Sequence, residues 1–471
     1  MRFISTRGRA APVGFVEALL AGLAEDGGLH APAAWPSLSP QAIAAFAGRP
    51  YADVAAEILG LFTAGEIENA ALRAICKTAY GAFAHPAVAP LRQLAPGRFL
   101  LELFHGPTLA FKDIAMRVLA GLIAHALAER GRTATIVTAT SGDTGGAAAA
   151  AFAGMAGVRL VVLYPQGRVS DVQRRFMTAT GADNVRCLAL GGDFDACQGV
   201  LKALFADRAF AAETGLAAVN SINFARIAAQ TVYYFTAAAS LGAPHREVAF
   251  TVPTGNFGDA FAGWAARRMG LPVARLTVAT NANDIVARAL AEGLYRPGPA
   301  IATRSPAMDI QVASNFERLH FEYAGRDNLE TAAAFSAFAR TGEIALPRAM
   351  REALAELFEG RAVSPAATEA AMRRAFAQTG VLVDPHTAVG LAAADGAAAD
   401  AAAADAAAAP LDPRIPMVVL ATADPAKFPE AVAAAGLTPR APPPGLLDRP
   451  ERIDALPADA PAVKAYVRAW K

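Results

Sequence analysis

The 471-residue sequence has few charges and no long uninterrupted apolar run. Charged residues make up only 18% of it, and the formal net charge is +1, which gives no whole-molecule attraction for nucleic acid or an anionic membrane surface. No run of about 18 apolar residues predicts a membrane span, and the N-terminal stretch MRFISTRGRAAPVGF lacks the apolar segment of a signal peptide. These absences predict a cytoplasmic protein that binds neither nucleic acid nor membrane.

Cysteine is also scarce, with only Cys76, Cys187 and Cys197 in the chain. The three form no close metal-ligand pair, and an odd number fits a reducing compartment without a disulfide framework. We therefore expect core thiols and no metal site.

Apolar residues, by contrast, account for 54% of the chain, and its length is enough for two or three domains with large cores. Residues 1–95 show helical periodicity broken by Pro and Gly turns, which predicts a mainly helical N-terminal section. Beyond them, short apolar runs alternate with longer amphipathic stretches, the pattern of βαβ units on parallel sheets covered by helices on both faces. We expect an α/β fold with two such domains, at residues 96–240 and 241–471.

Two segments of the second domain have distinctive compositions. Residues 392–409 are nearly all alanine with an Asp every fifth position, and this spacing sends the acids around all sides of a helix. The segment predicts a solvated helix or a mobile surface insertion. After it, RIPMVVLATADPAKF at 414–428 predicts a last buried strand followed by a turn.

One lysine stands in apolar surroundings. Lys112 lies within LFHGPTLAFKDIAM (103–116), at the start of a predicted helix. A surface lysine lays its methylene stem on apolar neighbours and keeps its amine in water. Alternatively the amine is desolvated, in which case burial and the positive helix N-terminus lower its pKa. A lysine of the second kind can form a Schiff base with a carbonyl compound.

A turn rich in Ser, Thr and Gly precedes an alanine helix at TATSGDTGGAAAAAFAG, residues 138–154. Backbone amides at such a strand-to-helix turn bind anions, helped by the hydroxyls of Thr140, Ser141 and Thr144. The alternative is ordinary N-capping, in which Ser141, Asp143 or Thr144 accepts hydrogen bonds from the first helical amides.

A second glycine turn follows an apolar strand at PTGNFGDAFAGWAARRMG, residues 253–270. It lacks the Lys and Ser/Thr of a nucleotide P-loop, and the chain has no convincing dinucleotide fingerprint, so ATP and NAD are poor candidates. Asp259 would repel a phosphate unless it turns aside to cap the helix. Four residues of the turn could wrap a single phosphate ester with backbone amides: Gly255, Asn256, Phe257 and Gly258.

The lysine and the two glycine turns together match a cofactor with one aldehyde, one phosphate and an aromatic ring, as in pyridoxal 5'-phosphate (PLP). At these residues the sequence resembles the threonine synthase family, PLP enzymes of the tryptophan-synthase β fold group (PLP fold type II). Its length and motif set are similar to the longer bacterial and fungal branch. The motifs follow the family's order: STRG, GLAEDGGLHAP, FHGPTLAFKD, TATSGDTGGAA, NSINFARIAAQ, PTGNFGDAFAG, SNFERL, DPHTAVG and ATADPAKF.

The resemblance implies a PLP-dependent lyase that converts O-phosphohomoserine and water to L-threonine and phosphate by γ-elimination and β-hydration, the last step of threonine biosynthesis. Similar long-branch enzymes imply a monomer. Three alternatives stay open: a phospholyase that omits the hydration, a threonine or serine dehydratase, and a noncatalytic phosphate-metabolite sensor.

The resemblance also assigns roles to residues around the cofactor. Lys112 is implied to carry PLP covalently, Asp143 to lie near the ring hydroxyl, and Thr422 to face the pyridine nitrogen. Gly255, Asn256, Phe257, Gly258 and Asp259 are implied to form the phosphate loop. The chain departs from the family at Asp424, since similar sequences read ATAHPAKF.

The substrate's two anions need receptors of their own. We expect its carboxylate to bind at Thr140, Ser141 and Thr144, where the helix start favours negative charge. His386 is expected to be a hydrogen-bonded structural histidine. Each basic residue in the matching motifs is a candidate ligand of the substrate phosphate, or alternatively a structural ion-pair partner: His105, Arg226, Arg318 and Lys427.

Overall fold

The computed structural model describes residues 1–396 and 411–470. Within them, no helix is long and apolar enough to cross a membrane, and no group of three or more His, Cys, Asp or Glu side chains could hold a metal ion. The three cysteines are free and buried. Residues 392–394 of the alanine-rich segment end α17 (Pro385–Ala394), and the prediction for that segment from 397 onward lies outside the described residues.

The N-terminal section is mainly helical, as predicted, and carries one two-stranded antiparallel sheet. Its helices form where apolar residues recur at helical spacing: in α3 the buried side chains are those of Val54, Ile58, Leu59 and Phe62. The elements are β1 (Phe3–Ser5), α1 (Phe15–Ala21), β2 (His30–Pro32), α2 (Pro40–Ala44), α3 (Tyr51–Thr63) and α4 (Asn69–Tyr80).

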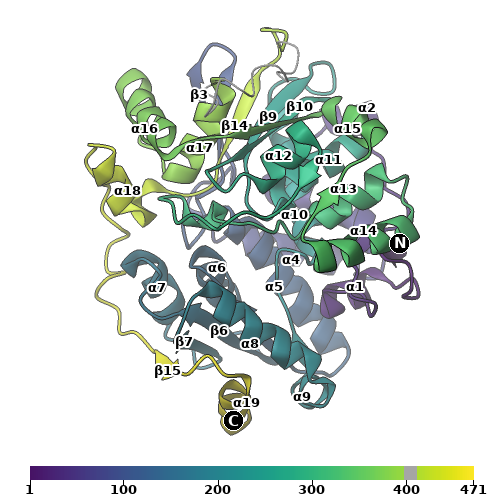
Figure 1. Ribbon diagram of the computed structural model, residues 1–471, viewed down its shortest axis with the longest axis vertical. Helices are drawn as coiled ribbons and strands as arrows, with labels where there is room; N and C mark the ends of the chain where they lie inside the picture. The colour runs from purple at the N-terminus through teal and green to yellow at the C-terminus, as the bar shows by residue number, and fades with distance from the viewer. Residues whose placement is uncertain (397–410, 471) are drawn as a thin grey trace.

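The upper half of the molecule in Figure 1 is built on a six-stranded sheet. Its strands are parallel except for the hairpin β3–β4. Nearly all residues of the central strands are buried, because helices cover both faces. The order is β13 (Phe358–Ala362), β10 (Val273–Thr280), β9 (Val248–Pro253), β14 (Met417–Ala421), β4 (Arg98–Glu102) and β3 (Leu91–Ala95).

The lower half contains a five-stranded, wholly parallel sheet. Its central strand VRLVVLYP is buried along almost its whole length, as an apolar run without alternation predicts. The order is β15 (Asp454–Leu456), β7 (Val185–Leu190), β6 (Val158–Pro165), β5 (Ala134–Ala139) and β8 (Leu216–Ala217).

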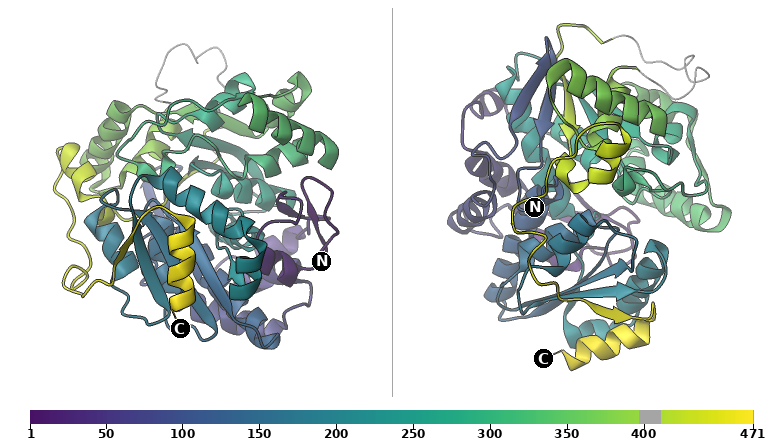
Figure 2. Two further views of the ribbon diagram at one scale, coloured as in Figure 1. Left: turned by 60° about the horizontal axis from the view of Figure 1, so that its bottom comes forward. Right: turned by 90° about the vertical axis from the view of Figure 1, so that its left-hand side faces the viewer.

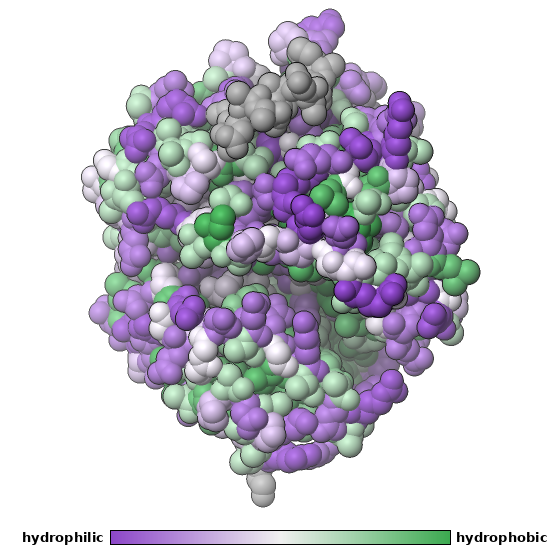
Figure 3. All heavy atoms as spheres, in the orientation of Figure 1, coloured by the Kyte–Doolittle hydropathy of each residue, from purple (hydrophilic) through white to green (hydrophobic). Residues whose placement is uncertain are grey.

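Helices around and between the sheets position the pocket described below. α10 packs against both α5 and α11, and Figure 3 shows the surface hollowed between the two halves. The helices that begin at this level are α5 (Lys112–Glu129), α6 (Asp143–Phe152), α7 (Asp171–Thr178), α10 (Phe224–Ser240) and α11 (Gly258–Arg268). The remaining elements are α8 (Phe194–Ala206), α9 (Arg208–Thr214), α12 (Ile285–Glu292), β11 (Leu294–Tyr295), η1 (Pro306–Met308), α13 (Phe316–Tyr323), α14 (Asn328–Thr341), β12 (Ile344–Ala345), α15 (Arg348–Ala355), α16 (Pro365–Thr379), η3 (Pro425–Lys427), α18 (Pro429–Ala434) and α19 (Ala460–Ala469).

The two sheets exchange strands across the predicted domain boundaries. β4 comes before α5 in the chain yet pairs with β14 in the six-stranded sheet. After α18 the chain runs back along the molecule (Figure 2), and β15 pairs with β7 in the other sheet. The expected domains 96–240 and 241–471 therefore do not coincide with the two sheets, since β4 of the first belongs to the six-stranded sheet and β15 of the second to the five-stranded sheet. Strand pairing over long sequence distances leaves no local signal in the sequence.

Candidate active site

A pocket lies where several strands of both sheets end and helices begin. It takes residues from the start of α5, the start of α6, α10, the β9–α11 turn and the end of β14. Carboxyl ends of parallel strands are the usual place for ligand sites in such sheets. The pocket brings together these predicted site residues: Lys112, Asp143, Thr144, Arg226, Gly255, Asn256, Phe257, Gly258, Asp259 and Thr422.

Lys112 is the first residue of α5 and its amine lies in the pocket. The backbone NH of Phe111 donates to the carbonyl of Thr422 at 2.8 Å, which fixes the helix start beside the end of β14. The Lys112 side chain is only 13% exposed, and its Nζ lies 3.7 Å from Oδ2 of Asp143. Burial lowers the pKa of Lys112, and Asp143 opposes this shift without cancelling it. The amine is thus the desolvated kind.

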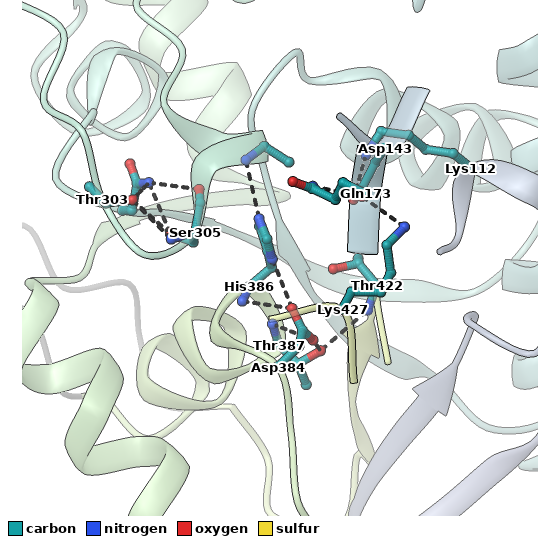
Figure 4. Close-up of polar contacts among 12 residues, drawn as sticks. Lys112, Asp143, Gln173, Thr303, Ser305, Asp384, His386, Thr387, Thr422 and Lys427 are labelled. Carbon is teal, nitrogen blue, oxygen red and sulfur yellow. Dashed lines mark hydrogen bonds and ion pairs between the residues drawn. The ribbon is translucent and has the colours of Figure 1, made fainter. Parts of the chain in front are cut away.

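Asp143 is held on its other side by Lys427, as Figure 4 shows. Nζ of Lys427 lies 2.8 Å from Oδ1 of Asp143, and Gln173 donates to the same oxygen at 3.0 Å. Lys427 also donates to the carbonyl of Thr108 at 2.8 Å and is almost wholly buried. Its predicted role as a ligand of the substrate phosphate receives no support from this position, because the lysine stands behind Asp143 and outside the pocket lining.

The turn between β9 and α11 has the form of an anion cradle. A Cβ at Gly255 would lie 2.7 Å from the carbonyl of Ala307, so only glycine fits there. Phe257 adopts a left-handed backbone with φ of 62° and buries its ring against Phe316 and Phe358. Within the described part of the chain, the amides of Gly255, Asn256, Phe257 and Gly258 have no acceptor. Free amides at a helix start suit a phosphate group.

Asp259 does not cap its own helix, contrary to the sequence expectation. Its Oδ1 accepts hydrogen bonds from the hydroxyls of Tyr233 at 2.5 Å and Tyr234 at 2.8 Å, both on α10. Burial raises the pKa of Asp259 to about 6, against the lowering effects of the two tyrosines and Lys112. The carboxyl group beside the cradle therefore keeps its proton to a higher pH than an ordinary aspartate, although it is mostly ionised at neutral pH.

Among the three hydroxyls predicted to bind the substrate carboxylate, only Thr144 lines the pocket. Oγ1 of Thr140 accepts from the amides of Gly142 and Gly145, each at 2.9 Å. Thr140 is buried and stabilises the turn before α6, which is the capping role that the sequence alternative gave to its neighbours. Ser141 lies outside the lining as well.

Arg226 is the predicted substrate cation that does line the pocket. Its Nη1 donates to the carbonyl of Val219 at 3.3 Å, while its buried Nε has no partner in the described part of the chain. Burial lowers the pKa of Arg226 to about 10, so the guanidinium stays charged at neutral pH. A buried cation with an unused donor is a ready receptor for an anionic ligand.

The other two predicted phosphate ligands lie elsewhere. His105 contacts Glu102 through Nε2 at 2.9 Å. Arg318 is fully buried and donates to the carbonyls of His30 at 3.0 Å and Ile222 at 2.5 Å, and to the side chain of Asn315. These contacts give Arg318 the structural role that the sequence left open as its alternative.

His386 is a hydrogen-bonded histidine, as expected, and it also borders the pocket. Its Nδ1 lies 2.8 Å from Oδ1 of Asp384 (Figure 4). Its Nε2 accepts from the amide of Ala307 at 3.2 Å. Ala307 is the residue whose carbonyl approaches Gly255. His386 thereby holds the segment that covers the anion cradle.

Asp424, the residue that departs from the family pattern, has two partners away from the pocket lining. Its Oδ1 accepts from the amide of Ala426 at 2.8 Å, and its Oδ2 pairs with Nη1 of Arg440 at 2.9 Å. The Asp424 carboxylate thus caps η3, and its charge is neutralised by Arg440.

Sequence reasoning did not single out several pocket residues. Ser221 and Gln230 lie within the motif NSINFARIAAQ, so the motif itself carried a signal that was not resolved to single side chains. Gln173 lies outside the pocket lining but contacts Asp143, and it was missed for another reason. Its capping box with Ser170 marks a helix start, but nothing local indicates that its amide also reaches Asp143.

The residues present fit PLP: a desolvated lysine for its aldehyde, free amides on a glycine turn for its phosphate, and the hydroxyl-bearing Thr422 in the same pocket lining. The fold and site define a PLP-dependent enzyme of fold type II. A family model described as "Pyridoxal-phosphate dependent enzyme" matches residues 90–350.

More specifically, the chain belongs to the threonine synthase family. Models of the threonine synthase N terminus and C-terminal region match residues 2–80 and 387–467. The chain is 46% identical to threonine synthase of Pseudomonas aeruginosa, covering 99% of this chain and 98% of the relative. A crystal structure of PLP-bound threonine synthase from Brucella melitensis matches with a TM-score of 0.94 and 47% identity, over 100% and 99% of the two chains. The yeast enzyme matches with a TM-score of 0.90 and 35% identity, over 100% and 98%.

Proposed function

We propose that this chain converts O-phosphohomoserine and water to L-threonine and phosphate, with the pocket around Lys112 as its active site. The observation that carries the proposal is the place of Arg226. It supplies a second anion receptor in the same pocket as the glycine cradle. A substrate that carries its own phosphate needs such a receptor in addition to the cofactor cradle, whereas the substrate of a dehydratase does not.

When bound, PLP delocalises negative charge from carbon atoms that are not acidic enough to lose protons alone. Lys112 is the proposed group that takes and returns the protons at the substrate carbons. Burial lowers the pKa of its amine, so more of it is available as a base near neutral pH. A positioned general base of this kind contributes roughly 10² to 10⁴ in rate.

The substrate's two anions are proposed to bind to two different groups of the pocket lining. The guanidinium of Arg226 would hold the phosphate by charge-assisted hydrogen bonds, which are stronger than neutral ones. Thr144 and the first amides of α6 would hold the carboxylate, since the start of a helix favours negative charge. Two such contacts would orient the carbon chain for proton transfer to and from Lys112.

Thr422 is proposed to face the ring nitrogen of PLP with a hydroxyl instead of a carboxylate. Its backbone is fixed on both sides, because its carbonyl accepts from Phe111 and its NH donates to Thr387 Oγ1 at 3.3 Å. A neutral partner there would leave the ring nitrogen largely unprotonated. This favours elimination and hydration over transamination.

Product analysis tests the proposal against its rivals. We expect purified holoenzyme to release L-threonine and phosphate in equal amounts from O-phosphohomoserine. A phospholyase would give 2-oxobutyrate with the phosphate, and a dehydratase would act on threonine or serine without releasing phosphate. A sensor would give no product and would lack visible cofactor absorbance quenched by borohydride.

We also propose that the enzyme works as a cytoplasmic monomer, as the resemblance to long-branch enzymes implies. A molar mass near 48.5 kDa by light scattering of the holoenzyme would support this state. A mass of twice that value would contradict it.

A further inference from the structure

Lys427 is a buried cation outside the lining of the candidate active site. It is the last residue of η3, which follows β14 after a short turn, and its side chain is 1% exposed. Its Nζ contacts Oδ1 of Asp143 and the carbonyl of Thr108, and lies 5.3 Å from the ring centre of Phe176. Burying an ammonium group costs several kcal/mol unless it is paired and hydrogen-bonded, so this lysine must matter to the group that it pairs with.

Asp143 offers its two oxygens to two different ammonium groups. Oδ1 receives Lys427 and the amide of Gln173, and Oδ2 lies 3.7 Å from Lys112. Burial alone would raise the pKa of Asp143, but the charges of Lys427 and Lys112 outweigh it and hold the pKa well below its usual range. The carboxylate is therefore a bridge between a lysine in the pocket and a lysine behind it.

The two lysines differ in one chemical respect. Lys112 changes its charge and bonding as the enzyme binds cofactor and moves protons, so it cannot be a constant counter-ion. Lys427 touches no reactant and keeps its contacts to Thr108 and Asp143.

Another carboxyl group near Lys427 is that of Asp113, which accepts from both the NH and the hydroxyl of Thr108.

We propose that Lys427 is a positioning residue that keeps Asp143 ionised and turned toward Lys112 in every protonation state of Lys112. Gln173 on α7 fixes the same oxygen from a third direction. Asp424 contributes indirectly, because it caps the turn that carries Lys427. The inference rests on the proposed function only in requiring bound PLP, and it can be tested by the cofactor spectrum in the absence of substrate.

The test is the visible spectrum of holoenzyme variants, titrated between about pH 5 and pH 9 without substrate. In wild type, Asp143 stays ionised and adds no transition to the titration. In Lys427→Met the carboxylate of Asp143 keeps Lys112 as its one ammonium partner, and the charge of Lys112 varies. The pKa of Asp143 therefore rises, and we expect a new pH-dependent change of the cofactor spectrum. The double variant Lys427→Met with Asp143→Asn should lack this change, because no titrating carboxyl remains.

Controls separate this role from simple stability. Lys427→Gln keeps a donor for Thr108 without the charge, and should reproduce the new titration if Lys427→Met folds poorly. Lys464→Met removes the remote ion pair with Asp207, whose atoms lie 2.6 Å apart, and should leave the spectrum unchanged. A wild-type titration curve in both Lys427 variants overturns the proposal. So does a new transition that persists in the double variant.

Kinetics provide the second readout. A positioning role predicts that kcat falls in the Lys427 variants while KM for O-phosphohomoserine stays within about threefold, since Lys427 does not touch the substrate. A large rise of KM with kcat unchanged would instead identify Lys427 as a phosphate ligand and refute the proposal. If the enzyme makes a product other than threonine, the proposed function fails but the spectral test still stands.

Discussion

The carboxylate Oδ1 of Asp259 lies 2.5 Å from the hydroxyl of Tyr233, so the Asp259 side chain at the start of α11 points toward α10. This contact keeps the acid in place beside the phosphate cradle although its other oxygen is buried without a partner among the described residues. Hydrogen bonds to one oxygen do not compensate for burial of the whole group, which explains the direction of its pKa shift.

Asp259→Asn should make the stability of the cofactor-free protein less dependent on pH. The folded pKa is about 6 and the ordinary value 3.8, so the unfolded chain gives up this proton more readily. Folding stability is therefore lost as the pH rises from about 4 through 6. The variant, measured by denaturant unfolding, should gain on wild type by up to about 3 kcal/mol at pH 7.5 relative to pH 4. An equal difference at both pH values would contradict the assignment.

Lys112→Ala should abolish covalent attachment of PLP, because no other lysine lies in the pocket lining of the described chain. We expect threonine formation to fall by at least roughly 10² to 10⁴. Mass spectrometry after borohydride reduction provides the direct measurement. Lys202→Ala, on an exposed position of α8, is the matched control and should keep both adduct and activity. An adduct retained in Lys112→Ala would refute the assignment.

Arg226→Met should raise KM for O-phosphohomoserine more than it lowers kcat. Loss of a charge-assisted hydrogen bond costs about 1.5–3 kcal/mol, equivalent to roughly 10- to 150-fold in affinity. Arg318→Met is the informative comparison, since it removes a guanidinium that donates to three protein groups. That variant should lower the thermal midpoint instead. A raised KM in Arg318→Met, with only a lower thermal midpoint in Arg226→Met, would instead make Arg318 the substrate ligand and Arg226 the structural residue.

Thr422→Asp should change the product. A carboxylate facing the ring nitrogen would favour its protonated form, and we expect less threonine and more keto acid from the same substrate. Chromatographic quantification of both products gives the ratio. Thr422→Ser, which keeps a neutral hydroxyl, should leave the ratio near that of wild type. An unchanged ratio in Thr422→Asp would show that this side chain does not face the nitrogen.

Asp424→Ala should cost about 1 kcal/mol of folding stability, mainly through loss of the cap on η3. Arg440→Ala removes only the ion pair, and the 63% exposure of the Arg440 side chain predicts a change of about 0–1 kcal/mol. Denaturant midpoints of the two variants separate these contributions. Equal losses in both variants would mean that the ion pair, not the cap, stabilises the turn.

Local patterns in the sequence were enough to predict the α/β class and to select residues that the structure brings into one pocket. Lys112 and the turn from Gly255 to Asp259 each lie where a strand or turn gives way to a helix. Consecutive residues of the sequence mark such a boundary. The directions of side chains were not predictable in this way. Arg226 and Arg318 occupy similar motifs, but only the packed structure puts one in the pocket and the other among backbone carbonyls.

The same limit applies to long-range pairing. The strand β4 and the strand β14 are neighbours through contacts that span most of the chain, and the apolar pattern of either strand fits several partners. Lys427 illustrates the effect at the site, since its motif predicted a cation near an anion but not that the anion would be Asp143.

The last strand has a consequence for biosynthesis of the protein itself. β15 closes an edge of the five-stranded sheet beside β7, and Val463 and Val467 of α19 complete the apolar core on that side. A ribosome makes the other four strands of this sheet long before it makes these residues. The four strands made earlier therefore keep an open edge beside β7 until residues 454–467 have been synthesised, so a chain that stops before these residues would leave this edge exposed to aggregation.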